Sequence, residues 1–183
     1  MNRPHVLLLT KLRGEAIIRV KVDKLMIERN ANGLRRSPFT DLSKEDIDHI
    51  KAEVRAIQAD ESVFVFNKGR QTGYVDEIDE IRVRCDVFPD SSSKHPRDLM
   101  SERAVLAHEY YGHRYYKGKL EYGSWNDEFR ASYAAAKNAP NISDDDRRYL
   151  ILDALERAKE AGVTITHNDF IRGVLYGCKI NEE

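Results

Sequence analysis

The sequence has little of what marks a secreted, membrane-spanning or nucleic-acid-binding protein. It holds only two cysteines, Cys85 and Cys178, which form no C-x-x-C pair, so we interpret them as reduced thiols and not as a disulfide framework. No apolar run approaches the roughly 20 residues that span a bilayer, and the run at 6–9 is shorter than a signal-peptide core of about 7 to 15 residues. The formal net charge of −1 gives no general attraction to nucleic acid or anionic membranes. We therefore expect a cytoplasmic protein that binds neither.

The composition is instead that of a soluble globular domain. Of the 183 residues, 41% are hydrophobic and 33% are charged. This length suits one compact domain with a core of its own, and this balance is unlike that of disordered or fibrous chains. We predict a single domain over residues 1–183, without internal repeats or low-complexity linkers.

The predicted strands all lie in residues 1–97. Apolar and β-branched residues indicate short strands at 6–9, 15–22 and 62–66. From 80 to 88, apolar and polar residues alternate strictly, which is typical of a half-buried strand. One helix, at about 44–58, follows a capping-box pattern and carries apolar residues at helical spacing.

Residues 98–183 are predicted to be helical. Capping residues and stop signals divide this part into four helices: from Asp98 or Ser101 to about Tyr116, from Asn126 through Ala136, from Ser143 to Gly162, and from Asn168 onward. A strand-rich N-terminal half followed by a helical C-terminal half predicts the α+β class.

The clearest chemical signal is the segment His-Glu-Tyr-Tyr-Gly-His at residues 108–113. Zinc-binding helices commonly place two histidines four residues apart, about 40° around the helix, so that both imidazoles face one ion. His108 and His113 are five residues apart, which on an ideal α-helix leaves about 140° between them, too wide for a shared metal. One π-type turn would return both to one face, and Gly112 tolerates such a distortion. The pattern therefore predicts a metal site on the condition that a π-type turn forms between His108 and His113.

Glu128 is the candidate third ligand. A catalytic zinc usually takes three protein ligands and leaves a fourth position for water. Glu128 lies 15 residues after His113 at the start of the next predicted helix, and the connection at 117–124 is short enough to fold the two helices antiparallel. An acidic residue at a helix N-terminus also complements the helix dipole, so a purely structural role stays open.

The two segments together resemble the zinc-site motifs of the dipeptidyl-peptidase III family. The residues at 108–113 are similar to that family's H-E-x-x-G-H motif, and Asp-Glu-Phe-Arg-Ala at 127–131 is similar to its E-E-C-R-A-E motif. The resemblance implies a compact zincin-like domain with a zinc centre of the gluzincin type. It implies the zinc ligands His108, His113 and Glu128, and it implies Glu109 as the general base.

The sequence also departs from that family. Asp127 replaces the first Glu of the second motif, Phe129 replaces the Cys, and Ser132 replaces the final Glu, which changes the expected support of the histidines. The interval between the motifs is much shorter, and the family's enzymes are several times longer. The resemblance therefore implies a shared plan of the zinc site and not a shared substrate.

From this plan we expect a zinc-dependent metallopeptidase that hydrolyses peptide bonds in a peptide or protein substrate. Zinc lowers the pKa of a water molecule toward ~7, and Glu109 accepts the water's proton. We predict that residues 84–88 form an edge strand with which an extended substrate pairs. Candidate donors to the oxyanion are Tyr115, Tyr122 and His167, although aromatic residues at helical spacing are more often core.

The remaining polar residues carry weaker signals, and two other hypotheses stay open. Arg130 is interpreted as structural or as orienting a carboxylate near the metal, while His5, His49 and His95 have no motif around them. A second hypothesis is a binding or regulatory protein that keeps a zincin scaffold and cleaves nothing. A third is a structural α+β protein in which the histidine pattern arises by chance. The short chain leaves little room for a second lobe, so a protein partner is compatible with the first two.

Overall fold

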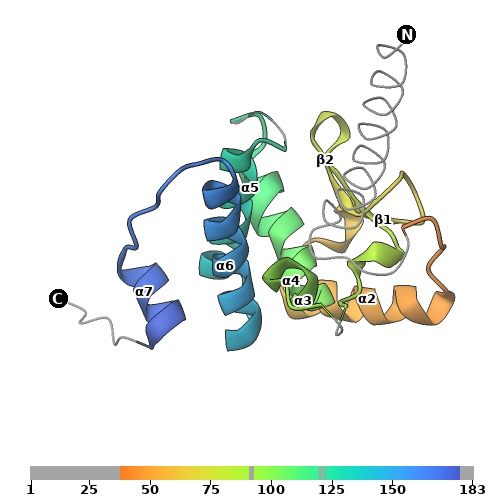
Figure 1. Cartoon of the computed structure of the whole chain (residues 1–183). Coiled ribbons are helices and arrows are strands. Elements are labelled where there is room, and N and C mark those ends of the chain that lie inside the picture. The colour runs from red at the N-terminus through yellow and green to blue at the C-terminus, as the bar shows by residue number, and fades with distance from the viewer. Residues whose placement is uncertain (1–37, 91–92, 120, 122, 178–183) are drawn as a thin grey trace, which may run out of the picture.

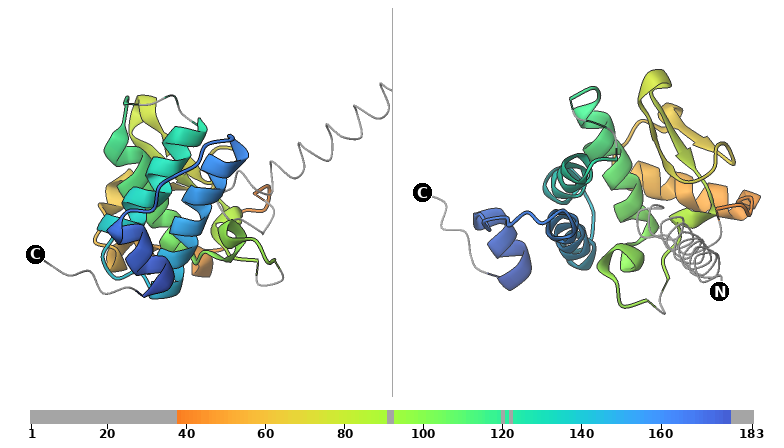
Figure 2. Two further views of the ribbon diagram at one scale, coloured as in Figure 1. Left: turned by 60° about the vertical axis from the view of Figure 1, so that its left-hand side comes forward. Right: turned by 45° about the horizontal axis from the view of Figure 1, so that its top comes forward.

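A small sheet and a group of helices make up the part of the chain that the computed structural model describes, residues 38–90, 93–119, 121 and 123–177. Their bounds are β1 Phe64–Phe66, β2 Gly73–Val75, β3 Glu80–Val83, α2 Lys44–Ala56, α3 Pro96–Leu99, α4 Glu102–Ala107, α5 Trp125–Asn138, α6 Asp144–Glu160 and α7 Asp169–Tyr176. Helix α4 lies in the middle, with the sheet and α2 on one side of it. Helices α5 and α6 lie on its other side, and α7 is outermost (Figures 1 and 2).

The sheet has the strand order β1-β3-β2, with β1 parallel and β2 antiparallel to β3. Phe64 of β1 and Tyr74 of β2 both lie opposite Ile81 of the central strand. These three side chains are buried in one hydrophobic core together with residues of the helices, among them Ile50, Val54, Val105, Leu106, Leu150 and Ile151. The core thus links the sheet to the helices on both sides of α4.

Most helices confirm the sequence-based predictions. The confirmed caps are Ser43 of α2, Ser101 of α4, Ser143 of α6 and Asn168 of α7, each accepting a hydrogen bond from a backbone N–H of the first turn. One predicted cap is wrong. Helix α5 begins after Ser124, whose hydroxyl accepts from the N–H of Asp127, so Asn126 already lies inside the helix.

The strand predicted at 80–88 is too long, because β3 ends at Val83 and a 3-10 turn follows at Cys85–Val87. Arg84 and Asp86, predicted on a solvent-exposed face, are buried. Their polar groups are satisfied inside the protein: Arg84 Nε donates to the carbonyl of Pro38 at 2.7 Å, and the N–H of Thr72 donates to Asp86 at 3.0 Å. Two polar positions of the alternating pattern are therefore buried and hydrogen-bonded inside the protein, and do not face solvent.

The substrate-pairing strand predicted at 84–88 is wrong for the same reason. Strand β3 ends at Val83, before these residues begin, and among the described residues the sheet edges are β1 and β2. Strand β2 was not predicted, since three residues are too few to show a period. The strand predicted at 62–66 starts as a 3-10 turn at Glu61–Val63 and becomes β1. The strands predicted at 6–9 and 15–22 lie outside the described residues.

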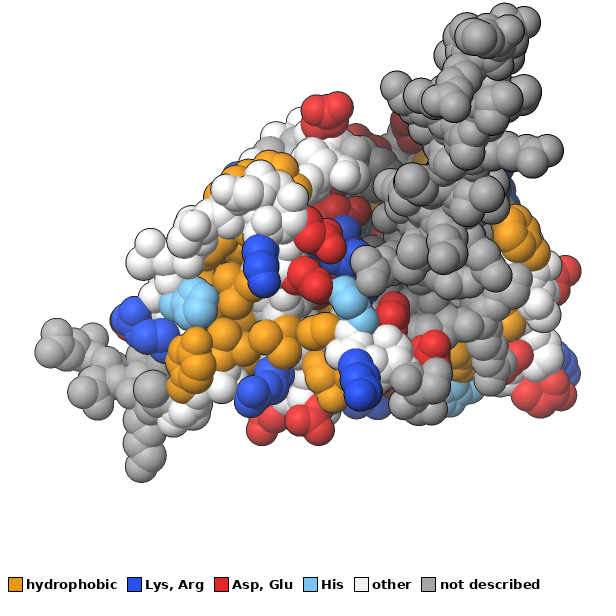
Figure 3. All heavy atoms as spheres, in the orientation of Figure 1, with side chains coloured by type: hydrophobic (Ala, Val, Ile, Leu, Met, Phe, Trp, Pro, Cys, Tyr) orange, Lys and Arg blue, Asp and Glu red, His pale blue; other side chains and the backbone are white. Residues whose placement is uncertain are grey.

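The observed class is a mixed one of helices and a small sheet, which agrees with the predicted α+β class at its coarsest level. The strand-rich N-terminal half stays a prediction. Among the described residues, no helix combines the length and the hydropathy needed to cross a membrane. On the face shown in Figure 3, hydrophobic side chains gather toward the C-terminal helices, and charged side chains surround them.

Candidate metal centre

The π turn required by the histidine spacing is present. Helix α4 leads without a break into a π-helical segment at His108–His113, here called the π turn. Its signature is the bond from the N–H of Arg114 to the carbonyl of Glu109, five residues earlier. The turn places the Nε2 atoms of His108 and His113 3.0 Å apart, with both side chains buried. The geometric condition set by the sequence is therefore met.

Residues inside the π turn hold it against both neighbouring layers. The Tyr111 hydroxyl donates to the carbonyl of Ile57 at 2.7 Å, and the ring of Tyr110 stacks on Phe64 of β1. On the opposite side, a Cβ at Gly112 would lie 2.6 Å from both the Cα and the carbonyl oxygen of Ala131 in α5. Gly112 is thus required by close approach of α5, a different reason from the backbone freedom that the sequence suggested.

Helix α5 brings Glu128 to the two histidines. Its Oε2 atom lies 3.5 Å from Nε2 of His108 and 3.7 Å from Nε2 of His113. A tetrahedral zinc ion with bonds of about 2.0–2.2 Å separates its ligand atoms by about 3.4 Å. The three atoms therefore form a triangle of the size that one zinc ion spans.

Hydrogen bonds behind the histidines fix which ring nitrogens carry protons. The carboxylate of Asp153 accepts from the Ser132 hydroxyl at 2.6 Å, and Ser132 Oγ lies 2.9 Å from Nδ1 of His108. Since the hydroxyl has one proton and gives it to Asp153, Nδ1 of His108 must be the donor to Ser132. Nδ1 of His113 lies 3.2 Å from Asp127 Oδ2, which favours a proton on this ring nitrogen, because a carboxylate only accepts.

These protons leave two lone pairs facing each other. A neutral imidazole with a proton on Nδ1 carries its lone pair on Nε2. Two such atoms at 3.0 Å repel unless a positive charge lies with them, either a proton on one ring or a metal ion. Burial by itself would lower the pKa of His113, but the nearby carboxylates of Asp127 and Glu128, 3.2 and 3.7 Å away, outweigh this and hold the pKa well above the usual value. Either a proton on His113 or a bound metal ion would relieve this repulsion.

A second carboxylate, that of Glu109, lies close to the histidines. The residue is fully buried, and a carboxylate oxygen lies within 4.8 Å of a ring nitrogen of each histidine. Its Oε2 accepts from the N–H of Tyr74 on β2 at 2.8 Å, so the sheet holds this side chain in place. Both carboxylates are thus near enough to share a cation with the histidines: Glu109 within 4.8 Å of them, and Glu128 Oε2 at 3.5 and 3.7 Å from their Nε2 atoms.

Arg157 of α6 holds Glu128 in its charged form. Burial would raise the pKa of Glu128, yet the Arg157 guanidinium, 3.0 Å from Oε2, and the nearby rings of His108 and His113 keep it well below the usual value. Around the histidines, four carboxyl groups face two guanidinium groups; they belong to Glu109, Asp127, Glu128, Asp153, Arg97 and Arg157. Carboxyl groups therefore outnumber guanidinium groups around the two histidines.

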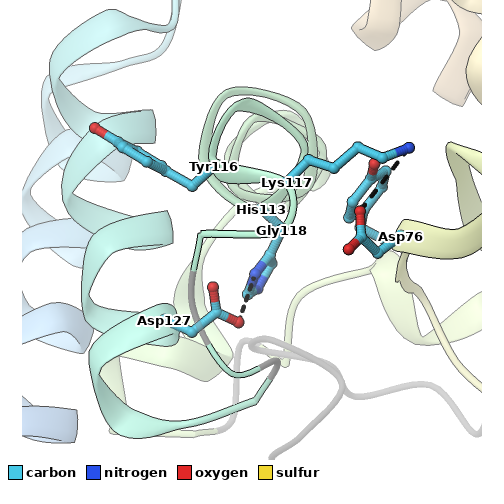
Figure 4. A pocket seen from close by; sticks show the side chains of 7 residues that line it. Asp76, His113, Tyr116, Lys117, Gly118 and Asp127 are labelled. Carbon is cyan, nitrogen blue, oxygen red and sulfur yellow. Dashed lines mark ion pairs between the residues drawn. The ribbon is translucent and has the colours of Figure 1, made fainter.

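A small pocket reaches the centre from the surface. It lies between the end of β2, the segment that follows the π turn, and the start of α5, and it is lined by Tyr74, Asp76, His113, Tyr116, Lys117, Gly118 and Asp127. Figure 4 shows two ion pairs there, His113 with Asp127 and Lys117 with Asp76, the latter at 3.9 Å. Its volume of about 20 Å³ admits roughly one water molecule. In this conformation the pocket is too small for a peptide.

Not every residue singled out from the sequence belongs to the centre. Tyr115 is exposed and packs edge-on against the ring of Tyr116, and His167 stacks on Tyr176, the last residue of α7. Tyr122 lies outside the described residues. The guanidinium of Arg130 lies over the Tyr116 ring, 5.4 Å from its centroid.

Two residues of the centre, Asp153 and Arg157, had no predicted role. A signal was present in α6, where both share an apolar stripe with Leu150, Ala154 and Ala158, all buried. A charged pair at i and i+4 within such a stripe indicates charges that are partnered inside the protein.

Comparison of the chain with protein-family models, with curated proteins and with solved structures found no match. Function is therefore inferred from the geometry of this centre.

Proposed function

We propose that this protein is a zinc-dependent metallopeptidase with the ligands His108, His113 and Glu128. The observation that carries the proposal is the triangle of ligand atoms, with sides of 3.0, 3.5 and 3.7 Å, formed by the π turn and α5. Each histidine also has an acceptor behind its second ring nitrogen, as metal-bound histidines almost always do. This donor set, two imidazoles and one carboxylate, is that of known catalytic zinc sites.

The chemistry divides between the ion and Glu109. Zinc bound there would acidify a water molecule and polarise the scissile carbonyl. Glu109 accepts the water's proton and delivers it to the departing amine. The bond from Tyr74 N–H to Glu109 Oε2 holds the carboxylate in place beside the histidines. Burial of the centre excludes bulk water, which strengthens these interactions.

Access of a peptide requires the pocket to widen. The segment after β2 is held to the end of the π turn by Arg114, which donates to both Asp79 oxygens at 3.0 Å, and by the longer pair of Lys117 with Asp76. Partly exposed pairs of this kind are weak, about 1 kcal/mol or less each. We expect a substrate to enter as this segment moves away from the π turn.

Glu109→Gln tests the general-base role. The substitution keeps the size and the bond from Tyr74 but removes the proton acceptor, so the variant should bind zinc as wild type does and lose about 10²- to 10⁴-fold in hydrolysis rate. Cleavage is measured by unbiased peptide-library profiling, with zinc content measured on the same samples. Full activity in Glu109→Gln would refute the assigned base.

A second candidate is a zinc-binding scaffold that cleaves nothing. The enclosed centre favours it, since His108, Glu109 and His113 are all buried and the pocket admits about one water molecule. This candidate predicts zinc-dependent stability without cleavage of any peptide in the library. The same profiling experiment therefore separates the two candidates.

A further inference from the structure

Ser132 occupies an unexpected position for a residue that supports a metal ligand. Metal-bound histidines commonly donate their second N–H to a carboxylate, a backbone carbonyl or water. His108 donates to the hydroxyl of Ser132, which is neutral and fully buried. A neutral acceptor orients the ring but adds no negative charge, so the charge must come from elsewhere.

Asp153 of α6 supplies that charge from one layer further away. Its Oδ2 accepts the Ser132 proton at 2.6 Å, and the residue is fully buried. Two guanidinium groups keep it in place, with Arg97 Nε at 2.5 Å from Oδ1 and Arg157 Nε at 3.0 Å from Oδ2. Their charges outweigh the effect of burial and hold the pKa of Asp153 well below its usual value.

The same helix also reaches the carboxylate ligand. Arg157 binds Asp153 through Nε and Glu128 through its terminal nitrogen, which lies 3.0 Å from Oε2. Asp153 and Arg157 are one helical turn apart, so α6 touches the supports of two of the three candidate ligands. Such a closed chain of contacts restrains His108 and Glu128 relative to each other.

We infer that Ser132 and Asp153 are positioning residues of the metal centre: Ser132 transmits the charge of Asp153 to His108, fixes the proton of His108 on Nδ1 and directs Nε2 toward the ion. The inference rests on the proposed metal centre and adds α6 to it. It explains how a carboxylate, that of Asp153, acts on His108 although the residue in direct contact with the ring is the neutral Ser132.

The first test removes only the hydroxyl. Ser132→Ala should weaken zinc binding by about 10- to 100-fold, the loss that follows from removing an outer partner of a ligand. The affinity is measured by competition with a chelator, and the visible absorption spectrum of the Co²⁺ form reports the ligand geometry. Ser93→Ala is the matched control, since Ser93 donates to Asp98 at 2.8 Å in the same kind of pair away from the centre. The control should change neither readout.

Two outcomes separate the inference from the proposed function. Wild-type affinity and an unchanged Co²⁺ spectrum in Ser132→Ala would overturn the inference and leave the metal centre standing. No zinc binding by the wild-type protein would overturn the metal centre itself.

The second test needs neither zinc nor a substitution. Long-range ¹H–¹⁵N spectra of the histidine rings in metal-free protein should show a proton on Nδ1 of His108, because the Ser132 proton is committed to Asp153. A His108 ring without that proton would overturn the inference, whatever the metal content.

Discussion

Gly112 offers a direct test of how tightly the π turn and α5 must pack. In Gly112→Ala the new Cβ would lie 2.6 Å from the Cα of Ala131 and 2.7 Å from its Cβ. Carbon atoms prefer a separation of about 3.5–4.0 Å, so the two helices must move apart by about 1 Å. Overpacking of this degree costs roughly 1–3 kcal/mol in the free energy of unfolding.

The displacement also reaches the metal centre, because Glu128 lies on α5 three residues before Ala131. A shift of about 1 Å would lengthen its distances to the histidines from 3.5 and 3.7 Å beyond the span of one zinc ion. We expect zinc affinity to fall by at least about tenfold. Urea unfolding of the metal-free protein gives the stability, and chelator competition gives the affinity.

Gly162→Ala is the matched control for this prediction. Gly162 has a φ of 73°, and among the described residues no atom beyond its chain neighbours lies within 4 Å of the Cβ that alanine would add. The substitution therefore strains the backbone without moving a helix. It should cost about 1–2 kcal/mol of stability and leave the zinc affinity unchanged. Wild-type zinc affinity in Gly112→Ala would refute the reasoning that ties Gly112 to the ligand triangle.

Two further predictions concern a ligand and a buried acid. Glu128→Gln should abolish the stabilisation that zinc gives, about 2.7 kcal/mol at 100 times the Kd in wild type, as thermal or urea unfolding will show; an undiminished effect would exclude Glu128 as a ligand. Burial, with a contribution from Glu109, raises the pKa of Asp86 from 3.8 to about 6. Protonated Asp86 therefore contributes fully to the free energy of unfolding below about pH 4. This contribution, about 3 kcal/mol, is lost as the pH rises through 6 and the buried carboxyl ionises. Asp86→Asn should lack this loss in urea unfolding between those pH values; an unchanged pH slope would contradict the raised pKa.

The local parts of the fold and site could be predicted because their signals are local. Serine and asparagine caps mark helix starts, and the five-residue spacing of His108 and His113 is compatible with a shared ion only through a π turn, which is present. Glu128 could be placed because a short connection returns α5 to the histidines.

The remainder depends on contacts between distant segments. Asp153 meets Ser132 and Arg97 only once α6 is packed against α5 and α3, and nothing in the residues around it indicates those partners. The polar residues Arg84 and Asp86 suggested a solvent-exposed face, but Pro38 and Thr72 satisfy them internally. Sequence periodicity indicates which residues share a face of a strand or helix. It does not indicate whether another part of the chain buries that face.

The most direct test of the account is the metal content of the purified protein and of His113→Ala. Elemental analysis of wild type, after exposure to zinc and removal of the excess, should give close to one zinc per chain, whereas His113→Ala should retain little. Absence of near-stoichiometric zinc in the wild type, or equal zinc in both proteins, would contradict the assignment of His108, His113 and Glu128 as one metal centre.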